Sequence, residues 1–415
     1  MKKSIFEGLK VADFTAAIAG PLATRYLAAE GATVIKVECH KHPDSVRLVP
    51  PYKDMEPGID RSTQFAFYNY GKKSVALDVN QPQGREIAIR LIEWSDVLIE
   101  NMAPGVMKKW ELDYQTVKKL KPDIVYLSSS SLGRTGPFSG YGAWGYHHGP
   151  LVGFAHMIGW PDRLPNYDAI AYTDSVAPSF SLTSLIAALL YRRRTGKGCH
   201  IDQSQTEAGA YFLGPEILDY TTNTRVAQRN GNRDPHMVPH GIFPCSGEDK
   251  WVAMAVSSQE EWVAFCKVLE KQDWLEDDRF KSFAARKEYE DVLESLITNW
   301  TIRHPREEIV ELLQNTGVPA GIVANTGDLF ADPQLEHRQH LQTVDHPEIG
   351  PHTIEVPSTH FSKVPHQSQK PAPLIGEHTD YVFRELLGYT DDEVADFLIN
   401  GIITTDEDLP DVGSY

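Results

Sequence analysis

The chain has 415 residues, of which 41% are hydrophobic and 23% are charged. This composition excludes a disordered or collagen-like protein and allows two or three domain-sized cores. Forty basic residues against 57 acidic ones give a formal net charge of −17, so we expect neither nucleic acid nor an anionic membrane as a partner. An anionic ligand would need a local site of basic side chains or backbone N–H groups.

The N-terminal half alternates strand and helix patterns. Strands are expected at Lys10–Phe14, 32–38, 96–100 and 123–129, and helices at 22–30, 81–94 and 114–121. The strands are continuously apolar, and helices separate them, which is typical of a parallel sheet covered on both faces. The fold class is therefore predicted to be α/β.

A long helix is expected at 179–194, because apolar residues recur there at helical spacing. The next segment, 221–244, is rich in Asn, Arg, His and Pro and reads as a linker or loop. A strand at 251–256 and helices at 259–269, 289–300 and 305–315 indicate a smaller second domain. Strands follow residue 329, and two helices, 379–387 and 391–399, end the pattern. The expected domains are 1–220, 221–325 and 326–415, with the first and last forming one large domain.

The sequence carries no sign of export or membrane insertion. Glu7, Lys10 and Asp13 interrupt the N-terminal segment, so we expect no signal peptide. The longest apolar run, 185–191, is about half the length of a membrane span. The four cysteines show no CxxC spacing and are expected to be reduced thiols. We therefore expect a cytoplasmic, soluble protein.

Several common motifs are missing. The sequence has no phosphate-binding GxxxxGK[ST], no GxGxxG after a strand, no HExxH and no GxSxG. Sixteen histidines include close pairs, but none comes with a matching carboxylate or cysteine pattern. We predict no metal site.

Asp174 is the most informative acid, because it lies just ahead of the expected helix at 179–194. The positive end of that helix would keep its carboxylate ionised and ready as a nucleophile or base. Alternatively, Asp174 only caps the helix. The serine run 128–131 ends a strand, at the edge of an open sheet where ligands tend to approach.

Short segments along almost the whole chain resemble one enzyme superfamily. They are 8–13 (GLKVAD), 19–21 (AGP), 31–38 (GATVIKVE), 73–78 (KSVALD), 100–105 (ENMAPG), 193–198 (RRTGKG), 317–321 (GVPAG), 331–334 (ADPQ) and 373–379 (PLIGEHT). In this order they resemble the class III CoA-transferases, which include formyl-CoA and carnitine CoA-transferases and α-methylacyl-CoA racemase. The benzylsuccinate CoA-transferase branch is a candidate subgroup.

The resemblance implies a large Rossmann-like domain built from both chain ends, with a smaller domain inserted, in an interlocked ring-like homodimer or a heteromer with a homologous subunit. It implies transfer of CoA from an acyl-CoA, with succinyl-CoA as a candidate donor, to a small carboxylic acid. Coenzyme A would be a co-substrate, and no permanently bound cofactor is expected. Asp174 would form first a mixed anhydride and then an aspartyl-CoA thioester.

Other site residues follow from the same resemblance. The residues expected to bind CoA are Ala17, Leu77, Asn80, Asn101, Met102, Lys108, Lys109, Trp110 and Tyr146. Lys72 and Lys73 are expected to add phosphate-binding charge. His148, His236 and His240 are expected in the substrate pocket. The loop 234–241 replaces a glycine-rich lid, so we expect an acceptor other than oxalate.

Two alternatives stay open. His148 and Asp174 could act as an acid/base pair on opposite faces of an acyl-CoA, as a racemase or isomerase requires. The chain could also be a non-catalytic subunit of a heteromeric CoA-transferase.

Overall fold

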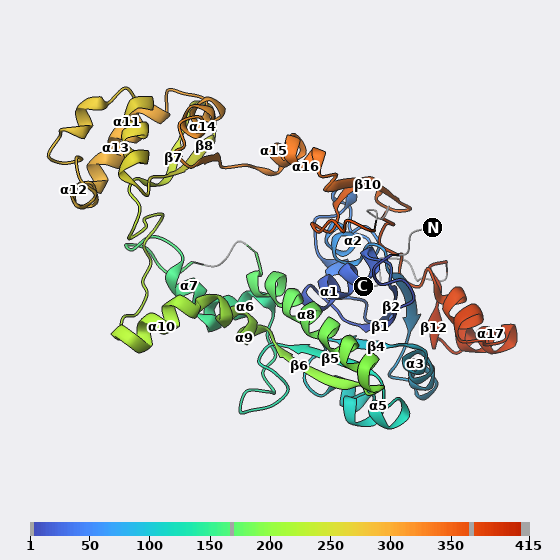
Figure 1. The fold of residues 1–415 in the computed structure, drawn as a ribbon. Coiled ribbons are helices and arrows are strands. Elements are labelled where there is room, and N and C mark those ends of the chain that lie inside the picture. The colour runs from blue at the N-terminus through green and yellow to red at the C-terminus, as the bar shows by residue number, and fades with distance from the viewer. Residues whose placement is uncertain (1–3, 167–169, 365–368, 408–415) are drawn as a thin grey trace. The chain divides into compact units, whose positions relative to one another are not determined.

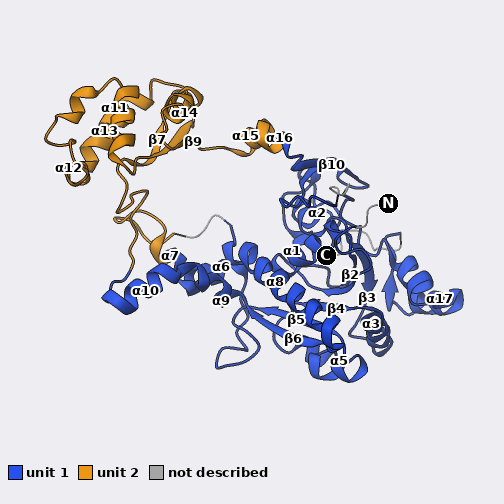
Figure 2. Ribbon diagram, in the orientation of Figure 1, with its two compact units in different colours: residues 1–155, 167–226, 337–415 blue, residues 156–166, 227–336 orange. Residues whose placement is uncertain are grey.

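The computed structural model describes residues 4–166, 170–364 and 369–407 (Figure 1). The chain divides into two compact units, shown in Figure 2. Unit 1 holds residues 1–155, 167–226 and 337–415, and unit 2 holds 156–166 and 227–336. The ends of unit 2 differ from those of the predicted insert, 221–325, and unit 2 also includes the short segment 156–166.

Unit 1 is built on a seven-stranded sheet with the order β12-β3-β2-β1-β4-β5-β6. All neighbouring strands are parallel except β12, which pairs antiparallel with β3. The strands are β1 Lys10–Phe14, β2 Thr33–Glu38, β3 Lys73–Leu77, β4 Val97–Glu100, β5 Val125–Ser130, β6 Cys199–Ser204 and β12 Ile403–Thr404. The coarse prediction of an α/β fold with a parallel sheet is confirmed.

The strand sequences fit a sheet that is buried on both faces. In β1, Val11 packs on one face with Leu27 and Leu185, while Ala12 and Phe14 pack on the other. Successive residues of a strand point to opposite faces, so a continuously apolar strand needs cover on both. Helices supply that cover on both sides.

The helices of unit 1 are α1 Ala19–Ala29, α2 Thr63–Asn69, α3 Pro82–Trp94, α4 Val106–Lys109, α5 Tyr114–Leu120, α6 Gly145–Val152, α8 Tyr172–Thr195, α9 Gln205–Ala210, α10 Gly214–Asn223 and α17 Asp391–Ile399, with α7 Phe154–Met157 at the limit of unit 2. Four of them, α1, α3, α5 and α17, lie within a few residues of the expected ranges, whereas α2, α4, α6, α7, α9 and α10 were not expected. The helix expected at 379–387 is a π-helix, Tyr381–Leu386. A two-stranded sheet, β10 Leu341–His346 with β11 Gly350–Glu355, completes the unit.

Helix α8 begins at Tyr172, well before the expected start near residue 179. Pro178 lies inside this helix, although proline is tolerated best in the first turn. Within the described residues, α8 has the length and composition to cross a membrane. It packs against α1, α9, β5 and β6, as a core helix of this sheet does.

Unit 2 has its own core around Trp262, Phe265 and Ile297. Its three-stranded antiparallel sheet and helices are β7 His240–Pro244, β8 Trp251–Ala255, β9 Ala320–Ile322, α11 Gln259–Val268, α12 Phe283–Glu288, α13 Glu290–Thr301, α14 Arg306–Gln314, α15 Thr326–Phe330 and α16 Pro333–His337. The expected loop at 221–244 is only partly a loop, because α10 reaches residue 223 and β7 begins at residue 240.

Candidate functional site

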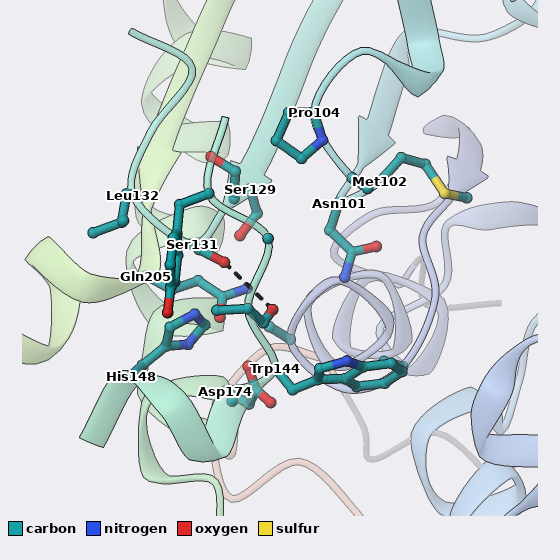
Figure 3. A pocket seen from close by; sticks show the side chains of 18 of the residues that line it. Asn101, Met102, Pro104, Ser129, Ser131, Leu132, Trp144, His148, Asp174 and Gln205 are labelled. Carbon is teal, nitrogen blue, oxygen red and sulfur yellow. Dashed lines mark hydrogen bonds between the residues drawn. The ribbon is translucent and has the colours of Figure 1, made fainter. Parts of the chain in front are cut away.

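The main pocket of unit 1 lies where β1, β4 and β5 end. Strand β1 is flanked by β2 on one side and β4 on the other, so the order of the parallel strands reverses direction there. Ligands of open α/β sheets bind outside the carboxyl ends of the strands at such a reversal. A pocket of about 450 Å³ opens at this position, and segments 16–19, 101–104, 129–133 and 141–145 line it together with His148, Asp174 and Gln205 (Figure 3).

Asp174 lies in the first turn of α8 and faces this pocket (Figure 3). Its side chain does not cap the helix, since Ala171 is the N-cap residue, so the capping interpretation is wrong. Asp174 is 7% exposed, and no described residue forms a hydrogen bond or ion pair with its carboxylate. Burial therefore raises its pKa from 3.8 to about 7. The expectation that the helix keeps this group fully ionised is wrong.

Two residues near Asp174 affect its side chain and its main chain. Gly145, the first residue of α6, lies so close that a Cβ atom there would collide with Oδ2 of Asp174. Pro178 has no N–H group, so the main-chain carbonyl of Asp174 lacks the usual helical donor four residues on. The carboxylate of Asp174 is therefore confined by Gly145, and its main-chain carbonyl is left without a helical hydrogen bond.

A tight turn after β1 also lines the pocket. The N–H of Ala16 donates to Oδ1 of Asn101, and Nδ2 of Asn101 donates to the carbonyl of Ala16, both at 2.8 Å. Ala17 adopts a left-handed φ of 63°, and its N–H donates to Asp44. These bonds hold a strained turn in place, and Ala17 and Asn101 both line the pocket.

Two buried ion pairs lie next to this turn and stabilise it. Nζ of Lys36 donates to Oδ2 of Asp44 at 2.9 Å and to the carbonyl of Thr15 at 2.7 Å. Lys72 pairs with Asp13 at 3.1 Å, and both side chains are fully buried. Lys72 is therefore unavailable to a phosphate, and its expected role in CoA binding is wrong.

The loop after β4 is fixed by a second charged pair. Arg134 donates to both carboxylate oxygens of Glu100, at 2.9 and 2.7 Å, and to the carbonyl of Met102 at 3.0 Å. The N–H of Met102 donates back to Glu100. Met102 is thus held at the rim of the pocket that it lines.

A second pocket, of about 370 Å³, adjoins the first. The two share Ala16, Ser45 and Met102, so a long ligand can extend from one into the other. Leu77, Asn80 and Trp110 line the second pocket, and Nε1 of Trp110 donates to Oδ1 of Asn80 at 3.0 Å. Six of the nine residues expected to bind CoA therefore line one pocket or the other: Ala17, Leu77, Asn80, Asn101, Met102 and Trp110.

The remaining three lie outside these linings. Lys108 and Lys109 are exposed on α4, between Val106 and Trp110, which both line the second pocket. Tyr146 is exposed on α6, one residue beyond Gly145. Lys73, which was expected to add charge, is half-buried with Nζ 4.5 Å from the ring centre of Tyr381.

Of the three histidines expected in the substrate pocket, one, His148, lines the same pocket as Asp174. His148 lines the main pocket and is 1% exposed. Its Nδ1 lies 3.2 Å from Oγ1 of Thr173, while Nε2 has no partner among the described residues. Burial, with a smaller effect of His147, lowers its pKa to about 4, so His148 is neutral at pH 7. His236 and His240 belong to unit 2 and are not among the lining residues.

Sequence reasoning missed Gly145, Ser129, Ser130 and Gln205 as specific members of the pocket. The serine run at the end of β5 was a usable signal, since it suggested an edge that ligands approach. Nothing in the sequence pattern singles out Gln205. Among the described residues, no group of three or more His, Cys, Asp or Glu is arranged to hold a metal ion.

Comparisons with known proteins agree on one family. A family model described as CoA-transferase family III matches residues 6–379. Succinyl-CoA:glutarate CoA-transferase of Mus musculus is 29% identical over 402 residues, covering 97% of this chain and 91% of the relative. Succinyl-CoA–D-citramalate CoA-transferase of Chloroflexus aurantiacus is 27% identical over 389 residues, covering 94% and 96%. The solved structure of a CAIB/BAIF family protein from Brucella suis has a TM-score of 0.85 at 29% identity, covering 92% of this chain and 100% of that one.

Proposed function

The chain belongs to CoA-transferase family III, and on that premise we propose that it moves CoA from succinyl-CoA to a second carboxylic acid through covalent intermediates on Asp174. The observation that carries the proposal is the environment of Asp174, which is buried, unpaired and directed into a pocket at the carboxyl ends of the strands. The curated relatives named above use succinyl-CoA, which supports that donor.

The reaction conserves the activated acyl group in reversible steps. The Asp174 carboxylate attacks the thioester carbonyl of succinyl-CoA, which gives a mixed anhydride and CoA thiolate. The thiolate then attacks the Asp174 carbonyl, so that succinate leaves and an aspartyl-CoA thioester remains. The acceptor carboxylate displaces CoA thiolate to form a second anhydride, and the thiolate takes the acceptor acyl group, which restores Asp174.

Burial of Asp174 serves this chemistry in two ways. A carboxylate with a pKa of about 7 is more basic than an exposed one and therefore a stronger nucleophile. A site that excludes water also protects the anhydride and thioester from hydrolysis. The close approach of Gly145 limits where the carboxylate can point, both when it attacks the thioester and when CoA thiolate then attacks its carbonyl.

The two adjoining pockets suit the two ends of CoA. We place the nucleotide end in the second pocket, beside Trp110, Asn80 and Leu77, and the thioester in the first, beside Asp174. The exposed Lys108 and Lys109 then supply positive charge for the phosphates against the negative field of the whole chain. CoA enters as a co-substrate, and no bound cofactor is needed for these steps.

We further propose that the enzyme works in the cytoplasm as a dimer, either with itself or with a homologous subunit. Helix α10 and the residues before it expose large apolar side chains, including Tyr211, Phe212 and Leu218. Contiguous exposed apolar residues are typical of association surfaces. Light scattering of the purified chain tests this, and a monomer at micromolar concentration would contradict the self-association.

Chemical trapping tests the covalent mechanism. Incubation with succinyl-CoA followed by hydroxylamine should convert Asp174 to a hydroxamate, and borohydride should reduce the acylated residue. Mass spectrometry of the peptide that contains Asp174 reads out both, with protein lacking acyl-CoA and D174N as controls. An unmodified peptide from active protein would overturn the role of Asp174, and a chain without activity or modification would support the non-catalytic alternative.

A racemase or isomerase is the second candidate, favoured by one observation: His148, with Nε2 unpartnered, and Asp174 line the same pocket. Loss of the α-deuterium from a 2-methylacyl-CoA, without any acceptor acid, would support it. Because His148 is neutral, it would act as the base at pH 7 and Asp174 would have to supply the proton.

A further inference from the structure

We propose that Arg134 is a positioning residue, which aligns the main pocket with the second pocket so that one acyl-CoA molecule reaches correctly across both. This inference rests on the proposed CoA transfer and adds to it a residue that acts without touching the substrate. Arg134 lines neither pocket. Its effect would pass through Met102, which lines both of them (Figure 3).

The linings of the two pockets share three residues, Ala16, Ser45 and Met102, which we call the junction. An acyl-CoA with its nucleotide end beside Trp110 and its reacting carbonyl beside Asp174 must pass the junction. The position of the junction therefore decides whether the carbonyl reaches the carboxylate while the nucleotide is bound. Such alignment matters for rate, because reacting atoms need to lie about 3–3.5 Å apart.

Arg134 fixes Met102 through one nitrogen atom. Nη2 of Arg134 donates to the carbonyl of Met102 at 3.0 Å and to both carboxylate oxygens of Glu100, at 2.9 and 2.7 Å. The N–H of Met102 donates to Oε2 of Glu100 at 3.0 Å. No other described residue donates to the Met102 carbonyl. Both main-chain polar groups of Met102 are thus held by this one ion pair, whose side chains are 18% and 2% exposed.

The same segment holds a second member of the junction. Asn101, between Glu100 and Met102, accepts from the N–H of Ala16 and donates to its carbonyl, both at 2.8 Å. Ala16 therefore takes its position from the segment that Arg134 holds. Two of the three junction residues depend on this segment.

Arg134 is itself fixed to the central sheet. Its N–H lies 2.9 and 3.1 Å from the two carboxylate oxygens of Asp202. Asp202 belongs to β6 and Glu100 ends β4, and β5 lies between these two strands. Hydrogen bonds to ionised groups are among the strong ones, so Arg134 couples the junction to the sheet.

Loss of this coupling should slow the reaction without preventing CoA from binding. In R134M the Met102 carbonyl loses its donor, while Leu77 and Trp110 still line the second pocket. We expect kcat to fall about 10-fold or more, and the Kd for CoA, measured by calorimetry, to change by less than about 3-fold.

Exchange of labelled succinate into succinyl-CoA measures kcat without any other acceptor acid. Labelled succinate attacks the aspartyl-CoA thioester and displaces CoA thiolate, which then takes the labelled succinyl group from the anhydride. The rate is divided by the amount of Asp174 that succinyl-CoA and hydroxylamine convert to the hydroxamate in the same preparation. Chains that are not folded therefore do not count.

Two further variants separate positioning from a general loss of structure. All three side-chain hydrogen bonds of Arg134 come from one nitrogen, so a single Nζ can replace it, and R134K should keep kcat within about 3-fold of wild type. R134M leaves Glu100 buried and unpaired, but R134M/E100Q removes that charge and still leaves the Met102 carbonyl without a donor. This double variant should be as slow as R134M.

R192M is the matched control. The Arg192 side chain is 22% exposed and pairs with Asp96 and Asp123, which lie just before β4 and β5, at the opposite ends of these strands. It is an arginine of similar burial with two partners, far along the strands from both pockets. Its kcat should stay within about 2-fold of wild type, because it does not align reacting groups.

Three results would overturn the role of Arg134. The first is a kcat in R134M equal to that in R192M. The second is recovery of kcat when E100Q is added to R134M, because the unpaired charge would then be the cause. The third is weaker CoA binding in R134M with unchanged kcat. If wild type neither exchanges succinate nor becomes modified at Asp174, the proposed CoA transfer fails, and the role of Arg134 fails with it.

Discussion

The backbone of Gly145 lies directly against the carboxylate of Asp174, with no space for a side chain between them. The two residues are far apart in sequence, at the first turns of α6 and α8. Their contact closes one side of the pocket and limits where the carboxylate can point. Gly145 does not adopt a left-handed φ, so its backbone conformation alone would accept another residue. A glycine is required here because the Asp174 carboxylate occupies the space that a Cβ atom would need.

A methyl group at position 145 should displace the nucleophile. In G145A, the new Cβ would collide with Oδ2 of Asp174 and lie 2.6 Å from Cβ of Ala171. We expect kcat to fall by about 100-fold or more, because small misplacements of a reacting group are costly. Steady-state transfer from succinyl-CoA measures this. G140A, in the loop before α6 and with open space around its Cβ position, is the control; equal losses in both variants would mean that the contact has no special role.

The pH dependence of the reaction should report Asp174. Burial raises its pKa to about 7, and the attack on the thioester needs the ionised form. We expect kcat/KM for acyl-CoA to rise about tenfold per pH unit below pH 7 and to level off above it. His148 titrates near pH 4 and should not contribute between pH 5 and 8. A flat profile down to pH 5 would contradict the assignment of Asp174 as the nucleophile in the free enzyme.

Stability should change with pH in the sense opposite to that of a salt-bridged carboxylate. The pKa of Asp174 is higher in the folded chain than in the unfolded chain, where it is near 3.8, so its ionisation favours unfolding as pH rises from about 4 to 7. D174N lacks this penalty. It should be more stable than wild type by roughly 4 kcal/mol at pH 8 and by half of that or less at pH 5.

Denaturant unfolding of both proteins at the two pH values gives the comparison. D392N is a suitable control, because Asp392 is exposed at the start of α17. A D174N protein that is no more stable than wild type at pH 8 would mean that the carboxylate is well solvated or paired in solution.

The sequence predicts most of the fold because the core strands of unit 1 are apolar on both faces. Strand β1 and helix α17 match the predicted ranges, Lys10–Phe14 and Asp391–Ile399. Strands β3, β6 and β12 of unit 1 were not predicted, although β3 is buried from Ser74 to Leu77. β6, at the edge of the sheet, alternates half-buried and exposed residues before two buried ones, and the two residues of β12 are strand only because they pair with β3.

The site was predictable only in part. Asp174 and His148 could be identified from the sequence, and the structure places both at one pocket. The pKa direction of Asp174 was wrong, because it depends on burial by Gly145 and the rest of α6, which no local pattern reveals. Lys72 was also misassigned, since its partner Asp13 is 59 positions away in the chain and both are buried. The roles of His236 and His240, on unit 2, remain predictions.

Lys108 and Lys109 should control affinity for CoA rather than for the acid. Both are exposed on α4, beside the pocket that Trp110 lines, and the chain as a whole carries a net charge of −17. Replacing both with glutamate should raise KM for succinyl-CoA about 10-fold or more at low salt, and the effect should shrink as salt screens the charges. KM for the acceptor acid should change by less than about 2-fold.

K119E/K271E makes the same change in net charge at two exposed lysines elsewhere and serves as the control. Equal increases in KM for acyl-CoA from both double variants would show that overall charge, and not a site beside Trp110, governs CoA binding.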